Sequence, residues 1–219
     1  VELGVASGSR AYVARWPGSM TRHGDDREDR AMGKRTDMRA ECKRARRYWR
    51  ACLRRATPAE CAAGAEWYAT ARATARELAT AYGVPLEVAA GVIAATSPRE
   101  RWARNVFVAT EILRGGTPTG LSSNMARARR VVAAGDSWAG DYGPTAPKVS
   151  AFYANIMGNE DAVTIDTWML VAGGLTRQNM TALQYAALAD SLRKVAAEFH
   201  LSPAVAQAII WVVVRGSAV

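Results

Sequence analysis

Helix-start signals recur along this chain and constrain its fold more than any other feature. Thr57-Pro58-Ala59-Glu60, Ser97-Pro98-Arg99-Glu100 and Thr181-Ala182-Leu183-Gln184 each have the form of a capping box, in which two residues bond each other's backbone N–H. Ser202-Pro203 is a further helix start. No segment alternates apolar and polar residues as a half-buried strand does. The predicted fold class is therefore all-α, with eight or nine helices and short connections.

The spacing of apolar residues places these helices and divides the chain. Residues 1–36 mix Gly, Ser, Arg and Asp without a sustained period, which is typical of a flexible, poorly ordered arm. From residue 37 the pattern predicts one all-α domain that runs to residue 219. Its predicted helices cover residues 37–56, 57–83, 85–96, 97–114, 123–134, 148–158, a helix opened by Asp166, 181–200 and 202–215.

Positive charge is concentrated in the first quarter of the chain. The formal net charge is +9; residues 1–55 carry 15 Lys and Arg against 7 Asp and Glu, and residues 56–219 carry 14 against 13. Phosphate contacts with DNA would account for this asymmetry through counterion release, and a solvated leader is the alternative. The candidate DNA contacts, for which a solvated surface is the alternative, are Arg46 and Arg47 on the basic helix 37–56 and Arg127, Arg129 and Arg130.

Cysteine usage argues against a metal centre. Cys42, Cys52 and Cys61 stand ten and nine positions apart, without a C-x-x-C pair or clustered histidines. No cofactor and no metal are predicted. No charged-then-apolar leader opens the chain, and no apolar run approaches the ~20 residues of a membrane span. We therefore expect a cytoplasmic, monomeric protein without a membrane partner.

The most informative stretch runs from Lys148 to Met169, K-V-S-A-F-Y-A-N-I-M-G-N-E-D-A-V-T-I-D-T-W-M. Apolar residues at helical spacing follow Lys148, Gly158-Asn159 ends that helix, and residues 163–165 run extended. Lys148 then lies in the first turn of a helix, where a cation opposes the helix dipole, and Asp166 is placed to cap the next helix. The position of the lysine is unfavourable, which makes it a candidate functional residue.

This arrangement resembles the helix-hairpin-helix (HhH-GPD) glycosylase superfamily, which includes the endonuclease III type of DNA repair enzymes, over residues 85–174. In that superfamily the catalytic aspartate follows the hairpin in a V-D-T-like context, and bifunctional members carry a lysine at the start of the second hairpin helix. Here Asp166 lies in I-D-T-W-M, and Lys148 stands 18 positions before it. The resemblance implies an HhH-GPD-like helical fold, DNA as the partner, and Asp166 and Lys148 as catalytic residues.

The chain also departs from the family pattern. The family hairpin usually reads G-x-G-x-K, whereas this chain has G-P-T-A-P-K, in which Gly143 and Thr145 are the candidate DNA contacts. The cysteine cluster of the iron–sulfur branch is absent. The flanking segments I-A-A-T-S-P-R-E-R-W-A-R-N and Q-A-I-I-W-V-V-V-R resemble a divergent branch encoded by bacteriophages. Some phage relatives of the fold are thought to hypermodify thymine in DNA instead of excising it.

The two candidate catalytic residues indicate chemistry at an N-glycosidic bond. The carboxylate of Asp166 could stabilise positive charge on the sugar or orient the nucleophile. Attack by water gives base excision, whereas attack by a neutral Lys148 amine on C1′ gives a Schiff base that leads to strand cleavage. The alternatives are that Asp166 is only an N-cap and that Lys148 is a phosphate contact or a surface group.

A base that reacts in this way must first leave the stack, so we expect a pocket with aromatic walls. The candidate pocket residues are Trp102, Asn105, Tyr153 and Trp168, with core packing as the alternative for the tryptophans and a buried strut for Asn105. The predicted function is a DNA glycosylase acting on a modified or unusual base, with or without lyase activity. The alternatives are a transferase that loads an amine or amino acid onto an activated base, and a DNA-binding module without catalysis.

Overall fold

The structure is a computed structural model that describes residues 25–140, 142–143, 145–176 and 179–216, with side chains from residue 37 onward. The chain divides into two units, and residues 38–219 form the larger one. Of the predicted arm, residues 1–24 lie outside the described part. The basic helix predicted from residue 37 begins at Asp25 instead, so the rest of the arm is helical.

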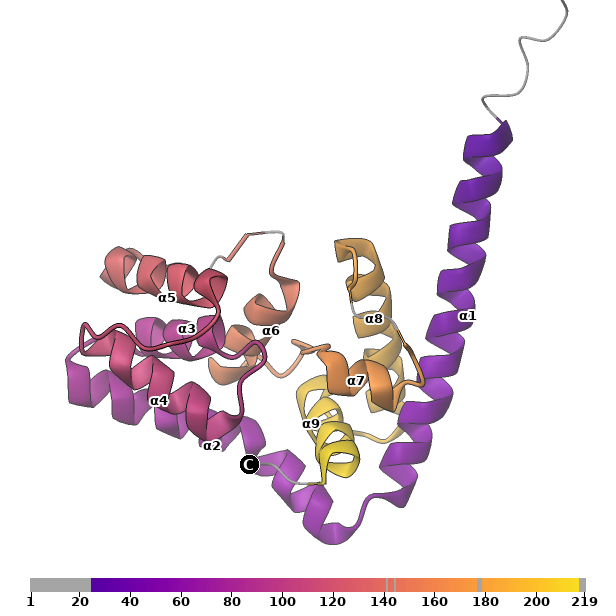
Figure 1. Cartoon of the computed structure of the whole chain (residues 1–219). Coiled ribbons are helices and arrows are strands. Elements are labelled where there is room, and N and C mark those ends of the chain that lie inside the picture. Colours follow the sequence, from indigo (N-terminus) through magenta and orange to yellow (C-terminus); the bar gives the residue numbers. More distant parts are fainter. Residues whose placement is uncertain (1–24, 141, 144, 177–178, 217–219) are drawn as a thin grey trace, which may run out of the picture. The chain divides into compact units, whose positions relative to one another are not determined.

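Helices make up the regular structure of the described residues, which confirms the all-α prediction (Figure 1). No β-strand occurs in that part of the chain. The helices are α1 (Asp25–Arg55), α2 (Pro58–Tyr82), α3 (Leu86–Thr96), α4 (Trp102–Leu113), α5 (Ser122–Ala134), α6 (Pro147–Ile156), α7 (Thr167–Ala172), α8 (Ala182–Glu198) and α9 (Pro203–Arg215). A short 3-10 helix, η1 (Gly135–Ser137), follows α5.

The helix ends confirm most of the predicted start and stop signals. The Glu60 N–H donates to Thr57 Oγ1 at 3.2 Å, and the Thr57 N–H donates to Glu60 Oε2 at 2.8 Å. Thr181 and Gln184 form a second box of the same kind before α8. Gly83 ends α2 in the left-handed conformation, with a φ of 61°. Local sequence therefore sets these boundaries.

The capping box predicted at Ser97 is wrong. Ser97 Oγ donates back to a carbonyl of α3 at 2.9 Å, and α4 begins only at Trp102, without a side-chain cap. Pro98 and Arg99 form a turn, which is closed by a hydrogen bond of 3.2 Å from the Glu100 N–H to the Ser97 carbonyl. The turn leaves Glu100 outside the helix, so its carboxylate cannot accept the backbone N–H that a capping box would offer it.

One of two hydrophobic cores surrounds α3. This helix is buried from Val88 to Thr96, and α2, α4, α5 and α6 all pack against it (Figure 1). Small residues allow the close approach: a Cβ on Gly91 would lie 2.8 Å from both Trp138 Nε1 and Val131 Cγ1. The chain between α5 and α6 therefore closes directly over the α3 backbone.

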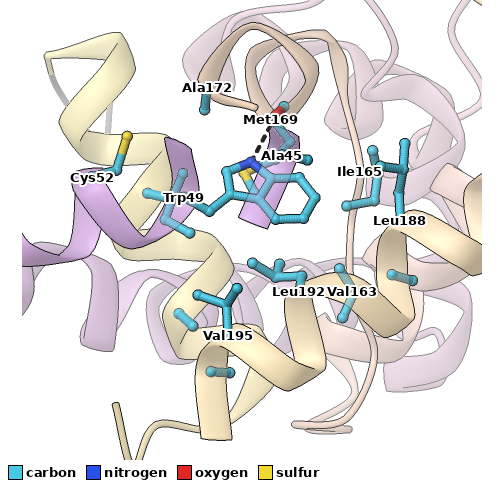
Figure 2. Close-up of a cluster of buried hydrophobic side chains, with 14 of the residues drawn as sticks. Ala45, Trp49, Cys52, Val163, Ile165, Met169, Ala172, Leu188, Leu192 and Val195 are labelled. Carbon is cyan, nitrogen blue, oxygen red and sulfur yellow. Dashed lines mark hydrogen bonds between the residues drawn. The ribbon is translucent and has the colours of Figure 1, made fainter. Parts of the chain in front are cut away.

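The second core surrounds Trp49 on α1 and includes side chains from α7, α8 and α9 (Figure 2). Trp49 is completely buried, and its Nε1 donates to the carbonyl of Met169 at 3.1 Å. This hydrogen bond fixes α7 against α1. Arg50 also connects α1 to α8, through two bonds of 2.5 and 2.6 Å to the carboxylate of Glu198. One cation of the basic helix thus contributes to the fold.

Helices α2 and α9 cross at Gly64 and connect the two cores. A Cβ on Gly64 would lie 2.6 Å from Ile209 Cγ1 and 2.7 Å from the Ile209 Cα and N atoms. Only glycine lets the two backbones approach this closely. Trp67 lies one turn beyond Gly64 on α2, and Trp211 lies two residues beyond Ile209 on α9, so the crossing brings these two rings together.

Candidate functional site

A cleft of about 990 Å³ is formed by both halves of the larger unit. Its lining comes from α2, the α3–α4 turn, α4 and α6, and also from residues 164–168, Asn179 and α9. The lining includes four tryptophans and both candidate catalytic residues: Trp67, Trp102, Trp168, Trp211, Lys148 and Asp166. The structure therefore brings Lys148 and Asp166 into one cavity.

Asp166 is the N-cap of α7, as predicted. Its Oδ1 accepts a hydrogen bond of 2.9 Å from the Met169 N–H, which satisfies a free donor of the first helical turn. Its Oδ2 accepts a second bond, of 3.1 Å, from Trp211 Nε1 on α9. Both carboxylate oxygens are therefore oriented by the protein while the group lines the cleft.

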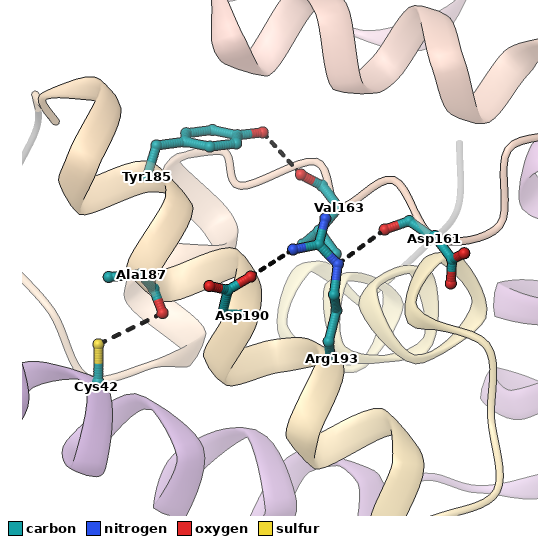
Figure 3. Close-up of polar contacts among 7 residues, drawn as sticks. All are labelled: Cys42, Asp161, Val163, Tyr185, Ala187, Asp190 and Arg193. Atoms are coloured by element: carbon teal, nitrogen blue, oxygen red, sulfur yellow. Dashed lines mark hydrogen bonds and ion pairs between the residues drawn. The ribbon is translucent and has the colours of Figure 1, made fainter.

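The segment before Asp166 is extended and buried, although it belongs to no sheet. Its backbone polar groups need other partners, because an unpaired buried N–H or C=O is costly. The hydroxyl of Tyr185 on α8 accepts from the Ile165 N–H at 3.0 Å. It donates to the Val163 carbonyl at 2.8 Å (Figure 3). The Tyr185 hydroxyl therefore bonds two backbone groups of the segment 163–165, which precedes Asp166.

Asn155 on α6 supports the same segment from the other side. This buried side chain donates to the Ala162 carbonyl at 2.8 Å, and its Oδ1 accepts from Thr164 Oγ1 at 2.8 Å. Arg193 adds an exposed bond of 3.2 Å to the Asp161 carbonyl (Figure 3). The position of Asp166 is thus tied to both α6, which carries Lys148, and α8.

Lys148 is the second residue of α6 and is partly exposed. Burial beside the cleft lowers the pKa of Lys148 below its ordinary value, and the charge of Asp166 opposes this shift. Within the described residues, no hydrogen bond or ion pair involves the Lys148 side chain. The amine is therefore unpaired and easier to deprotonate than that of a surface lysine.

Three tryptophans from different helices form one aromatic wall. The ring of Trp67 lies 5.2 Å from that of Trp102 and 5.2 Å from that of Trp211, measured between ring centres. The guanidinium of Arg215 lies 4.5 Å from the centre of the Trp211 ring. Trp168 also lines the cleft and is 44% exposed. Trp102 and Trp168 thus both line the cleft, where the sequence placed them.

The lining of the cleft also contains a neutral polar pair. The hydroxyl of Tyr68 is hydrogen bonded to Oε1 of Gln207, and both residues line the cleft. Burial raises the pKa of Tyr68 far above its ordinary value, so this phenol remains protonated. The pair supplies fixed hydrogen-bonding groups without adding charge.

Asn105 lines the cleft, but its polar atoms are already used. Its Nδ2 donates to the Ile93 carbonyl at 3.2 Å, and its Oδ1 accepts from Thr96 Oγ1 at 2.6 Å. Asn105 is buried and links α4 to α3. This geometry favours the structural interpretation of Asn105 over a role in holding substrate.

The prediction that Tyr153 lines the same pocket is wrong. Its ring lies 6.3 Å from that of Trp138 and 6.1 Å from that of Tyr142, in a separate aromatic cluster. Lys148 and Phe152, four residues apart on α6, both line the cleft. The next residue along a helix points about 100° away, which turns Tyr153 from the cleft.

The candidate hairpin residues do not line the cleft either. Gly143 has a φ of 79° and accepts a hydrogen bond of 3.2 Å from the Ala146 N–H. Thr145 is exposed. Both precede the N-terminus of α6, where an anion is favoured. A DNA contact at this hairpin therefore stays a prediction.

The arginines predicted to contact DNA lie outside the cleft on α1 and α5. Arg47 is exposed and Arg46 is partly exposed. Arg129 and Arg130 are exposed, whereas Arg127 is partly buried, and its charge lowers the pKa of Tyr142 against the larger effect of burial. Four of the five are thus at least partly available to a polyanion on a surface, and Arg127 is turned inward.

Sequence reasoning missed Trp67, Tyr68, Gln207 and Trp211 as site residues. Tyr68 and Trp67 follow the capping box of α2 at ordinary helical spacing, so they look like core residues. Gln207 carried a detectable signal, because it is an uncharged polar residue inside the apolar run of α9 and is buried. Such a residue usually has a specific hydrogen-bond partner.

Two properties of the described residues bear on cofactors and membranes. No group of three or more His, Cys, Asp or Glu residues in this part of the chain could hold a metal ion. No single described helix is long and apolar enough to cross a membrane, whereas the bent pairs α2 with α3 and α8 with α9 reach that length and composition only together.

The fold and the cleft define an all-α protein with a lysine and a capped aspartate in an aromatic cavity. The chain belongs to the family of unknown function DUF7178, whose model matches residues 33–218. The match covers every helix from α2 to α9. No curated protein and no solved structure matches the chain.

Proposed function

We propose that this protein is a DNA glycosylase-like enzyme that acts on the N-glycosidic bond of a modified base flipped out of DNA. The observation that carries the proposal is the presence of Lys148 and Asp166 in one aromatic cleft. The resemblance to the helix-hairpin-helix glycosylases supports the same residues. Arg99, Arg101 and Arg215 make the lining of the cleft net positive, which suits a phosphate-bearing substrate.

Asp166 is suited to stabilise the charge that develops on the sugar. Cleavage of an N-glycosidic bond leaves positive charge at C1′, and an oriented carboxylate stabilises this charge without reorganisation during the reaction. The bonds from Met169 and Trp211 fix the two oxygens of Asp166. The remaining lone pairs can face the sugar or hold an attacking water.

Lys148 is suited to act as a nucleophile. Its neutral amine would attack C1′ while the base leaves with the electrons of the glycosidic bond and takes up a proton. Loss of a proton from nitrogen and opening of the sugar ring would then give a Schiff base. The lowered pKa of Lys148 increases the fraction of neutral amine.

The experiment uses an abasic DNA duplex, because the aldehyde of an abasic site reacts with a lysine whatever the original base. Protein, duplex and sodium borohydride are incubated together, and the covalent adduct is measured on a denaturing gel. We expect a trapped adduct with the wild-type protein and none with Lys148→Gln. The matched control is Lys194→Gln on α8, which removes an exposed lysine outside the cleft and should leave the adduct unchanged.

A second arm identifies the reaction on intact bases. Duplexes that each contain one modified base are incubated with the protein, and the released bases and digested nucleosides are measured by mass spectrometry. Release of a free base supports excision. A heavier nucleoside would show instead that the protein transfers a group onto the base. DNA binding with no adduct, no free base and no altered nucleoside on any duplex would contradict an enzyme and favour a DNA-binding module.

A further inference from the structure

The turn between α3 and α4 holds an arginine in a conformation that suits glycine. Arg99 has a φ of 67°, in the left-handed region, and follows Pro98. The Glu100 N–H bonds the Ser97 carbonyl at 3.2 Å and closes the turn. Proline second and a positive φ third are the pattern of a type II turn, whose third residue is usually glycine. Arginine is therefore a strained choice at this position.

Strain of this kind is rare in the described residues and calls for a reason. Only Arg99 and His200 combine a side chain with a positive φ there. His200 follows the end of α8, a place where the left-handed conformation is common. Arg99 instead lines the cleft that holds Lys148 and Asp166. Strained residues of this kind collect at ligand sites, where the side chain is used.

The guanidinium of Arg99 is also unused by the protein. Within the described residues it takes part in no hydrogen bond and no ion pair, and the residue is exposed. Arg101, in the same loop, and Arg215, at the end of α9, add two further positive charges to its lining. A planar, unpaired guanidinium beside a cavity matches the oxygens of a phosphate.

We propose that Arg99 binds a phosphate group of the nucleotide whose base enters the cleft. This deepens the proposed function and rests on it for the identity of the substrate as DNA. It also places a phosphate contact at the cleft itself, in addition to the predicted contact at the Gly143 hairpin. The turn places Arg99 just before α4 in the lining of the cavity that also contains Asp166, so the phosphate would bind at the same cavity as the acid.

The experiment compares Arg99→Gly, Arg99→Lys and His200→Gly with the wild-type protein. Arg99→Gly removes the guanidinium and relieves the backbone strain, so the melting temperature should not fall. His200→Gly relieves the same kind of strain outside the cleft and serves as the matched control. Affinity is measured by fluorescence anisotropy on a duplex with one tetrahydrofuran abasic analogue, across a range of salt concentrations. Calorimetry with thymidine 5′-monophosphate and with thymidine forms a second arm.

We expect Arg99→Gly to weaken duplex binding about 10- to 100-fold, the range lost with a charge-assisted hydrogen-bonding pair. The slope of log K against log salt should fall by about 1. Arg99→Lys should keep that slope but lose part of the affinity, and His200→Gly should match the wild type. Unchanged affinity and slope in Arg99→Gly, on both duplex and nucleotide, would overturn the proposal.

The two proposals can fail separately. If the wild-type protein binds the nucleotide but not the duplex, and Arg99→Gly loses that binding, Arg99 remains a phosphate ligand and the DNA assignment is overturned. If the protein forms the borohydride adduct while Arg99→Gly binds the duplex as the wild type does, the enzyme stands and the role of Arg99 is overturned.

Discussion

The indole N–H of Trp211 donates a hydrogen bond of 3.1 Å to Oδ2 of Asp166, and this bond joins the acid to the aromatic wall. The Trp211 ring is itself held by Trp67, with ring centres 5.2 Å apart. The orientation of the carboxylate therefore depends on the packing of α2 against α9. A tryptophan that looks like a core residue thus acts on the candidate acid.

Trp211→Phe should separate these two roles. The substitution keeps an aromatic ring beside Trp67 but removes the N–H that orients Asp166. Base release should fall about 10-fold, with a stability loss of about 1 kcal/mol for one hydrogen bond. The control is Trp138→Phe, because Trp138 Nε1 is buried with no hydrogen-bond partner among the described residues. Equal turnover in the two variants would show that the bond from Trp211 to Asp166 does not affect the reaction.

Asp166→Asn should abolish most of the chemistry while leaving the fold intact. The amide oxygen can still accept from the Met169 N–H, so α7 keeps its cap. Loss of the charge should slow base release by at least ~100-fold, the scale for one electrostatic stabiliser of a transition state. DNA affinity should be unchanged or higher, since a negative charge is removed. Asp136→Asn, at an exposed site on η1, is the control, and wild-type turnover by Asp166→Asn would rule out the glycosylase.

The pH dependence of adduct formation should report on Lys148. Only the neutral amine attacks the abasic aldehyde, so the rate should rise with pH and level off above a midpoint lower than the ordinary 10.5. Because the charge of Asp166 raises the pKa of Lys148, Asp166→Asn should move the midpoint to still lower pH. The rate is measured by borohydride trapping from neutral to alkaline pH. An identical midpoint in the two proteins would show that the two residues do not interact.

The same shift predicts a change in stability with pH. Lys148 is harder to protonate in the folded chain, so between its folded pKa and 10.5 the unfolded state binds more protons. The free energy of unfolding should therefore rise with pH across this window. Below the folded pKa of Lys148, the destabilisation that this lysine causes should be at its full size. Urea unfolding at several pH values gives the free energy of unfolding of the wild type and of Lys148→Gln. The rise in stability that Lys148 causes should be present in the wild type and absent from the variant.

Tyr185→Phe should weaken the segment that carries Asp166. The change leaves the Ile165 N–H and the Val163 carbonyl without their partner inside the core. A stability loss of about 1–3 kcal/mol is expected, with a fall in melting temperature of about 2–4 °C per kcal/mol. Tyr48→Phe is the matched control, because Tyr48 is 43% exposed. A normal melting temperature in Tyr185→Phe would show that water replaces the phenol.

Charge reversal on α1 tests whether the basic helix contributes to DNA affinity. The double substitution Arg46→Glu with Arg47→Glu should weaken duplex binding and flatten its dependence on salt, because fewer counterions are released. Arg50 is left in place, since its bond to Glu198 stabilises the fold. Arg76→Glu with Lys194→Glu, at exposed positions on α2 and α8, makes the same change in net charge and is the control. An unchanged salt slope would remove α1 from the interface.

The sequence predicted the fold class and many helix ends because those depend on local chemistry. The box at Thr57 and the cap at Asp166 were visible as residue types at fixed spacing. The box at Ser97 had the same spacing but failed, because Pro98 and Arg99 turn the chain before the helix can start. The same residue spacing therefore gave a helix start at Thr57 and a turn at Ser97.

The candidate site was predictable in part: Lys148, Asp166, Trp102 and Trp168 were named from the sequence and line the cleft. Lys148 and Asp166 stood out because each occupies an unusual or well-defined place at a helix start. Tyr185 and Trp211 were not recognised, because their roles depend on hydrogen bonds to residues 20 and 45 positions away in the chain. No periodicity within one helix reports such partners, whereas a buried polar group in an apolar helix can hint at them.

The glycine at the crossing of α2 and α9 also bears on the cleft, because the helices on either side of the crossing support its two candidate reactive residues. Lys148 stands on a helix that packs against α2, and Asp166 precedes a helix that packs against α9. A methyl group at Gly64 would meet the Ile209 backbone at 2.7 Å and force the two helices apart. The spacing of the Lys148 amine and the Asp166 carboxylate therefore depends in part on a backbone contact, between Gly64 and Ile209, that lies outside the lining of the cleft.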